Sequence, residues 1–156
     1  MSRRPETIGA RSVPALLVDT SAFYALADES DEYHPSAKAL FQDLTKGGLQ
    51  LVTTTFILAE THALILARTG RADKALGFLT SIYGSRYTTL IRPTEADEQR
   101  ALAILATYHD KQFSFTDALS FTVMERLHLT DTFTFDHHFT QYGAQYGWTI
   151  LRPGQR

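Results

Sequence analysis

The chain has 156 residues, 44% of them hydrophobic, which is enough for one well-filled core and too few for two. It contains no cysteine, so disulfides, thiolate zinc sites and cysteine nucleophiles are excluded. Its formal net charge of -2 gives no global attraction to nucleic acid, so polyanion binding would need local charges or a bound cation.

The first segment of the chain differs in composition from the rest. Residues 1–12 carry three arginines with almost no apolar periodicity, so we expect a flexible tail there and one domain over residues 13–152. No apolar run is long enough to cross a bilayer, and the first residues lack the apolar stretch of a signal peptide. We therefore expect a cytoplasmic protein without a membrane segment.

Short apolar runs typical of strands alternate with helical patterns along the domain. The predicted strands are Ala15–Val18, Leu49–Thr53, Tyr87–Ile91, Asp131–Phe135 and Trp148–Leu151. The predicted helices, which fill every gap between strands except the last, are Ser21–Ala27, Pro35–Lys46, Phe56–Arg68, Ala72–Tyr83, Glu95–His109 and Asp117–Leu127. This alternation predicts an α/β fold with a parallel sheet covered on both faces, whose ligands bind beyond the carboxyl ends of the strands.

Four acidic residues stand where the pattern predicts apolar or neutral ones: Asp19, Glu60, Asp117 and Asp136. Asp19 directly follows a buried-strand run, and Asp136 ends the last alternating run before the C-terminal strand. If the two strands are neighbours in the sheet, these carboxylates lie at the same edge. Glu60 sits in a helix that is apolar almost all round, so we expect its carboxylate to be buried.

Desolvated carboxylates that meet in one place repel one another and are costly unless something compensates their charge. A hard divalent cation with oxygen ligands, Mg²⁺ or Mn²⁺, is the simplest compensation. The sequence therefore predicts that the four acids hold a metal ion.

Three of the four acids also have an ordinary structural explanation. Asp19 could cap the helix that follows it. Asp117 lies in the first turn of a helix, where the helix dipole stabilises an acid. Glu60 could form a salt bridge, for instance with Arg68 or Arg100. The sequence alone leaves these alternatives open.

Two threonines and two histidines adjoin the acids. Thr20 and Thr116 are candidates for binding a phosphate oxygen or orienting a carboxylate, with helix capping as the alternative. His137 and His138 follow Asp136, but adjacent side chains on a turn usually point apart, so we do not expect a zinc site. GxGxxG, GxxxxGK[ST] and GxSxG are absent, so dinucleotide, P-loop and serine-hydrolase chemistry lack their motifs.

The segments around the four acids occur in a characteristic order: Leu17–Phe23, Ile57–Glu60, Ser114–Ala118 and Thr134–Asp136. In order, context and spacing they resemble the PIN-domain family, in particular its VapC-like toxins, over roughly residues 15 to 151. The resemblance implies a PIN-like three-layer α/β/α sandwich with a central parallel five-stranded sheet. It also implies that the acids are catalytic, bind Mg²⁺ or Mn²⁺, and cleave single-stranded or structured RNA.

The resemblance further implies partners and a biological role. Relatives of this kind act as toxins of type II toxin–antitoxin systems, and many dimerise and are neutralised by an antitoxin protein. An apolar stripe could serve either contact if part of it is exposed, with core packing as its default explanation: Leu58, Ile65, Leu66, Leu76 and Leu79. The alternative function is a PIN-fold RNA- or protein-binding module with little or no nuclease activity.

Overall fold

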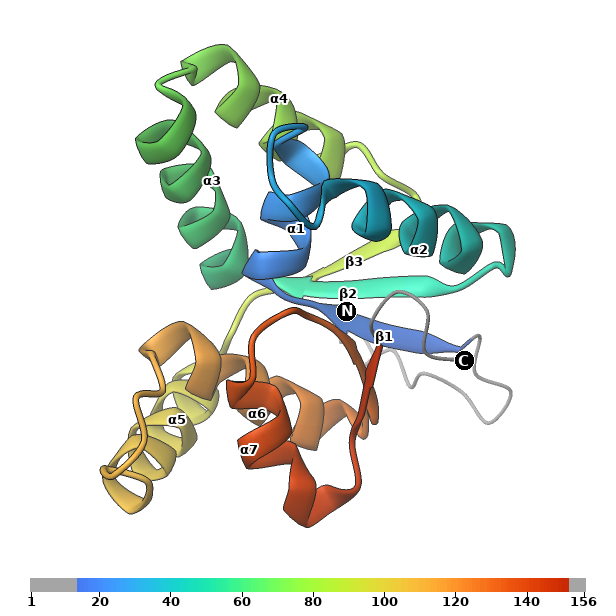
Figure 1. Cartoon of the computed structure of the whole chain (residues 1–156). Coiled ribbons are helices and arrows are strands. Elements are labelled where there is room, and N and C mark those ends of the chain that lie inside the picture. The colour runs from blue at the N-terminus through green and yellow to red at the C-terminus, as the bar shows by residue number, and fades with distance from the viewer. Residues whose placement is uncertain (1–13, 152–156) are drawn as a thin grey trace, which may run out of the picture.

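Five parallel strands form the centre of the molecule (Figure 1). The computed structural model describes residues 14–151, and its strands are β1 (Ala15–Val18), β2 (Gln50–Thr54), β3 (Thr88–Ile91), β4 (Asp131–Phe133) and β5 (Thr149–Leu151). Their order in the sheet is β3-β2-β1-β4-β5, and every neighbouring pair is parallel. The tail expected at residues 1–12 lies outside the described residues.

Helices cover both faces of this sheet. On one face lie α1 (Thr20–Ala27), α2 (His34–Lys46), α3 (Thr55–Thr69) and α4 (Ala72–Tyr83) (Figure 1). On the other lie α5 (Glu95–Thr107), α6 (Phe115–Leu127) and α7 (His138–Gly143), followed by the 3-10 turn Ala144–Tyr146. This arrangement confirms the expected three-layer α/β/α fold. No helix among residues 14–151 is both long and apolar enough to cross a membrane.

The gap before β5, which the sequence pattern left without a helix, contains α7, so that prediction is wrong. This helix has six residues, too few to display a helical period in the sequence. It is held by burial of Phe139 and Tyr142, both of which stack or pack edge-on against Phe121 of α6.

The central strand explains why its sequence reads as an unbroken apolar run. Leu16, Leu17 and Val18 of β1 are at most 1% exposed, because neighbouring strands flank β1 and helices cover both of its faces. From β1 the chain adds β2 and β3 on one side and later returns to add β4 and β5 on the other. The boundary between β1 and β4 is therefore the point where the strand order reverses, and open α/β sheets bind ligands at such a point.

The strands that precede Asp19 and Asp136 are neighbours, as the sequence analysis required. Val18 is paired with Phe133, and the Asp19 amide donates to the Phe133 carbonyl at 3.1 Å. The fourth strand is two residues shorter than predicted, since the Phe135 amide donates to the Ser21 hydroxyl at 2.9 Å. The segment after β4 thus turns toward the end of β1.

Candidate active site

Asp19 lies at the carboxyl end of β1 and is 2% exposed. Its Oδ2 accepts hydrogen bonds from the Ser21 hydroxyl at 3.2 Å and from the Thr134 hydroxyl at 2.9 Å. Asp19 occupies the N-cap position of α1 but makes no side-chain capping hydrogen bond. Helix capping therefore does not account for this acid. Both hydroxyls bind Oδ2, so neither of them contacts Asp19 Oδ1.

Asp117 has a structural role that the sequence already suggested. It is the third residue of α6 and forms a reciprocal capping box with Ser114, with both hydrogen bonds at 3.0 Å. The oxygen that accepts from the Ser114 amide, Oδ2, also lies 2.9 Å from His138 Nδ1. Because both contacts use Oδ2, the 5% exposed carboxylate still offers Oδ1 to a ligand.

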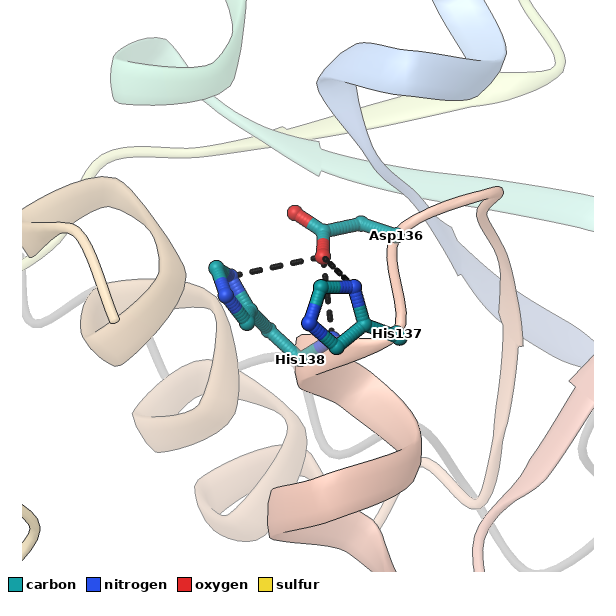
Figure 2. A group of neighbouring side chains, drawn as sticks. All are labelled: Asp136, His137 and His138. Carbon is teal, nitrogen blue, oxygen red and sulfur yellow. Dashed lines mark hydrogen bonds and ion pairs between the residues drawn. The ribbon is translucent and has the colours of Figure 1, made fainter. Parts of the chain in front are cut away.

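Asp136 follows β4 by three residues, and its side chain is 28% exposed. Its Oδ1 accepts from the His138 backbone amide at 2.9 Å and lies 3.3 Å from His138 Nδ1 and 3.7 Å from His137 Nδ1. Figure 2 shows both imidazole rings directed toward this carboxylate. The expectation that the two histidines point apart is therefore wrong, because the turn that begins α7 wraps around Asp136.

Burial and neighbouring charges shift the pKa values of the two buried aspartates, Asp19 and Asp117. Burial, followed by the charge of Asp117, raises the pKa of Asp19 to about 7, and the charge of Asp136 adds to this shift. Burial also raises the pKa of Asp117, where the Asp136 charge acts in the same direction against hydrogen bonds from Ser114 and His138. Within residues 14–151 no lysine or arginine pairs with any of the three. The cluster is acidic and partly desolvated, and histidines are the only basic side chains that contact it in the described part of the chain.

Glu60 is the fourth predicted ligand, and among residues 14–151 no hydrogen bond joins it to the three aspartates. It is exposed, so the expected burial is wrong: α3 is apolar almost all round, yet even Leu66 on this helix is 41% exposed. Glu60 makes no hydrogen bond or ion pair within the described part of the chain. Phe56, one turn earlier on the same helix face, packs edge-on against Phe115 with centroids 5.6 Å apart. Glu60 therefore lies on the face of α3 that meets the start of α6.

The salt bridges proposed as an alternative for Glu60 are not formed. The Arg68 guanidinium lies 4.7 Å from the centre of the Tyr24 ring, and Arg100 pairs with Glu125 at 3.3 Å. The carboxylate of Glu60 is thus available to an external ligand.

Neither predicted secondary residue caps a helix. Thr20 is the first residue of α1, behind Asp19, and Thr116 is the second residue of α6, behind the true cap Ser114 and Phe115. Thr116 is half-buried, whereas the Thr20 hydroxyl is buried without a hydrogen-bond partner in the described chain. An unpaired buried hydroxyl costs about 1–3 kcal/mol, so a partner from outside the protein would stabilise it.

Sequence reasoning missed three residues that shape the site. Ser21 and Thr134 fix the Asp19 carboxylate, and His138 contacts Asp117. Ser21 follows Asp19 by two residues and Thr134 precedes Asp136 by two, a symmetry of hydroxyls beside acids that was visible in the sequence. The contact with His138 could not be read from the sequence, because it depends on the unpredicted α7.

Comparison with known proteins places this geometry in a family. A family model described as PIN domain matches residues 16–145. The chain belongs to the PIN-domain family. Its fold resembles the crystal structure of Mycobacterium tuberculosis VapC20, described as a sarcin–ricin loop cleaving toxin, with a TM-score of 0.77 and 27% identity over 88% of this chain and 99% of that one.

Two curated proteins named VapC are also similar in sequence. The 23S rRNA-specific endonuclease VapC20 of Mycobacterium tuberculosis is 31% identical over 132 residues, which cover 82% of this chain and 94% of that protein. The VapC ribonuclease of Archaeoglobus fulgidus is 31% identical over 146 residues, which cover 91% of this chain and 90% of the other. These matches confirm the family resemblance and extend over nearly the whole PIN domain.

Proposed function

We propose that this PIN-domain protein is a cytoplasmic, metal-dependent endoribonuclease that acts as the toxin of a type II toxin–antitoxin system. The observation that carries the proposal is the meeting of Asp19, Asp117 and Asp136 where the strand order reverses, two of them buried, with no lysine or arginine of residues 14–151 paired to them. The ribonuclease names of its VapC relatives support the same activity class.

PIN nucleases generally use a divalent metal, and the residues here fit Mg²⁺ or Mn²⁺. Carboxylates from Asp19, Asp117 and Asp136 supply hard oxygen donors, and Glu60 offers a fourth carboxylate that no described residue pairs with. Asp19 and Asp117 are buried beside a third carboxylate, and their pKa values are raised for that reason. A cation bound between these carboxylates would offset their mutual repulsion. When bound, the cation supplies water activation and neutralisation of charge on the scissile phosphate.

The chain's own residues position these donors. Ser21 and Thr134 hold the Asp19 carboxylate, and the Ser114 amide holds that of Asp117. In this proposal the unpaired Thr20 hydroxyl donates to a phosphate oxygen, and Thr116 orients the neighbouring Asp117 carboxylate. Water is the nucleophile, so no side chain forms a covalent intermediate.

The substrate to test first comes from the relatives. A synthetic hairpin of the sarcin–ricin loop is compared with an unstructured RNA of the same length, because the structural relative is named for cleaving that loop. Cleavage is followed with Mg²⁺, with Mn²⁺ and with chelator, for the wild type and for Asp19→Asn. Asp110→Asn is the control, since the Asp110 side chain is 67% exposed.

We expect metal-dependent cleavage by the wild type and Asp110→Asn, and its loss in Asp19→Asn or with chelator. Equal cleavage in all conditions would refute the metal mechanism. Absence of cleavage of either RNA together with absence of Mn²⁺ binding in a calorimetric titration would favour the binding-module alternative.

We also propose a homodimer formed by the exposed part of the apolar stripe. Leu58 and Ile65 belong to the core, but Leu66 on α3 and Leu76 on α4 are 41% and 58% exposed. Sedimentation of the wild type should show a dimer that Leu76→Asp converts to a monomer. A monomeric wild type at micromolar concentration would contradict the dimer.

An antitoxin segment would have a separate place to bind. A cavity of about 620 Å³ lies between α1, α2, α4 and the sheet, and none of the four acids lines it. Its walls are mostly apolar, including Phe23, Phe41 and Phe78, and its lining carries two lysines, Lys38 and Lys74, and one acid, Glu29. These residues suit a partner segment that combines apolar and acidic side chains.

A further inference from the structure

Nitrogen donors border the acidic cluster, and the ribonuclease proposal does not use them. Asp136, His137 and His138 each offer one ligand atom, and these atoms all lie within 4.8 Å of one another. The three side chains come from the turn that begins α7 and face a common point near the Asp136 carboxylate (Figure 2).

The separations between donor atoms suit a small cation. Ligands bound at about 2.0–2.2 Å around a tetrahedral or octahedral ion are separated by roughly 3.0–3.5 Å. His138 Nδ1 lies 3.3 Å from Asp136 Oδ1, and His137 Nδ1 lies 3.7 Å from the same oxygen. Asp117 Oδ2 lies 2.9 Å from the same His138 Nδ1, so it borders this group of donors, and binding of an ion by that nitrogen would replace this contact.

Part of this donor set is already fixed in place. The His138 backbone amide holds Asp136 Oδ1 at 2.9 Å, and the His138 ring packs edge-on against Phe113 with centroids 5.4 Å apart. His138 is 18% exposed, whereas His137 is 70% exposed and can swing toward an ion. Only one ligand therefore has to be ordered on binding, which lowers the entropic cost.

The histidine nitrogens of this group favour other metals than the Mg²⁺ or Mn²⁺ proposed for catalysis. Mg²⁺ prefers oxygen ligands only, whereas imidazole nitrogen suits Zn²⁺, Ni²⁺ and Cu²⁺, and nitrogen–oxygen sites bind Zn²⁺ more tightly than Mn²⁺. We propose that Asp136, His137 and His138, with Asp117 beside them, form a Zn²⁺ site that takes the Asp136 carboxylate from the Mg²⁺ site and so makes Zn²⁺ an inhibitor of this nuclease. The inhibition rests on the proposed function, but the zinc binding does not.

Zinc binding is tested directly on the full, metal-free chain without an affinity tag. Calorimetry measures Zn²⁺ affinity, and visible absorption of bound Co²⁺ reports nitrogen ligation. The decisive variant is His137→Ala, whose exposed side chain can be removed without disturbing the core. His109→Ala is the matched control, because His109 is also exposed and its one side-chain hydrogen bond within residues 14–151 is to the Ala106 carbonyl.

We expect one Zn²⁺ per chain and an affinity at least about tenfold weaker in His137→Ala, since even the loss of an outer-shell partner costs about 10–100-fold. His109→Ala should bind like the wild type, and Mg²⁺ affinity should not follow the His137 change. Equal Zn²⁺ affinity in the wild type and His137→Ala would overturn the site.

Inhibition is tested by adding Zn²⁺ to RNA cleavage reactions at fixed Mg²⁺, each variant being compared with its own zinc-free rate. We expect His137→Ala to need at least about tenfold more Zn²⁺ for half-inhibition, in proportion to its weaker binding. Identical inhibition curves would overturn the zinc proposal. Zinc binding by a chain that cleaves no RNA would instead refute the ribonuclease proposal and leave the metal site standing.

Discussion

The negative charge of Asp19 should lower the free energy of unfolding of the metal-free protein, and Asp19→Asn should restore that free energy. The amide introduced by this substitution keeps an oxygen that accepts from the Ser21 and Thr134 hydroxyls, but it carries no charge to desolvate or to repel Asp117. The substitution proposed to abolish activity should therefore make the metal-free chain more stable.

The magnitude follows from the pKa of Asp19, which rises from 3.8 to about 7. A raised folded-state pKa means that stability is fully present below the unfolded value and is lost as the pH rises through the folded one. At about 1.36 kcal/mol per unit, the cost reaches about 4 kcal/mol at pH 7 and falls below about 2 kcal/mol at pH 5. We expect Asp19→Asn to gain about 2–4 kcal/mol at pH 7, because amide hydrogen bonds replace the carboxylate's imperfectly.

The assay is urea unfolding in chelator at both pH values, with Asp110→Asn as an exposed control that should stay within about 0.5 kcal/mol of the wild type. The gain in Asp19→Asn should shrink by more than half between pH 7 and pH 5. A variant that is no more stable than the wild type at pH 7, or a gain that is the same at both pH values, would refute the electrostatic reasoning.

Three further predictions concern the metal and the packing. Mg²⁺ should raise the melting temperature of the wild type at pH 7 but hardly that of Asp19→Asn, and equal shifts would place the ion elsewhere. Arg126→Ala should lower the free energy of unfolding by about 1–3 kcal/mol at pH 7, measured in urea, because it leaves the buried Asp97 without its ion pair. This range is reduced for solvent screening, since Arg126 is 43% exposed. Burial raises the pKa of Asp97, but its hydrogen bonds, those from Arg126 foremost, and the charge of Arg126 together outweigh burial, so the net pKa lies below its ordinary value. The loss of stability in Arg126→Ala should therefore shrink as the pH falls through the pKa of Asp97 in the folded protein. A loss that stays constant with pH would contradict the ion-pair explanation. Gly143→Ala should cost about 1–3 kcal/mol, because its Cβ would lie 2.7 Å from Trp148 Cε3, and unchanged tryptophan fluorescence and stability would contradict that contact.

Elements with strong local signals were predictable from the sequence. β1 and α4 match the predicted bounds, since an unbroken apolar run defines β1, and Gly70 and Gly84 lie just beyond the ends of α3 and α4. Helix α5 ends at Thr107, two residues before the predicted end, because the helical pattern carried no stop signal there. The family and the sheet architecture followed from motif order, which does not depend on such boundaries.

The limits of prediction at the site were set by tertiary structure. The adjacency of Asp19 and Asp136 could be stated only as a condition, because strand order depends on contacts between distant segments. The exposure of Glu60 was mispredicted because an apolar helix surface does not show which of its faces another element covers. The orientation of His137 and His138 was missed because α7 is too short to leave a periodic pattern.

The hydrogen bond between Thr134 and Asp19 joins residues 115 positions apart, which has a consequence during synthesis. A ribosome adds roughly 5–20 residues per second, so on the order of ten seconds separate the making of these two halves of the site. Until the segment after β4 leaves the exit tunnel, a nascent chain has only part of the cluster. In the proposed ribonuclease, activity would begin only after this segment has been made, and truncated products ending before β4 would be harmless.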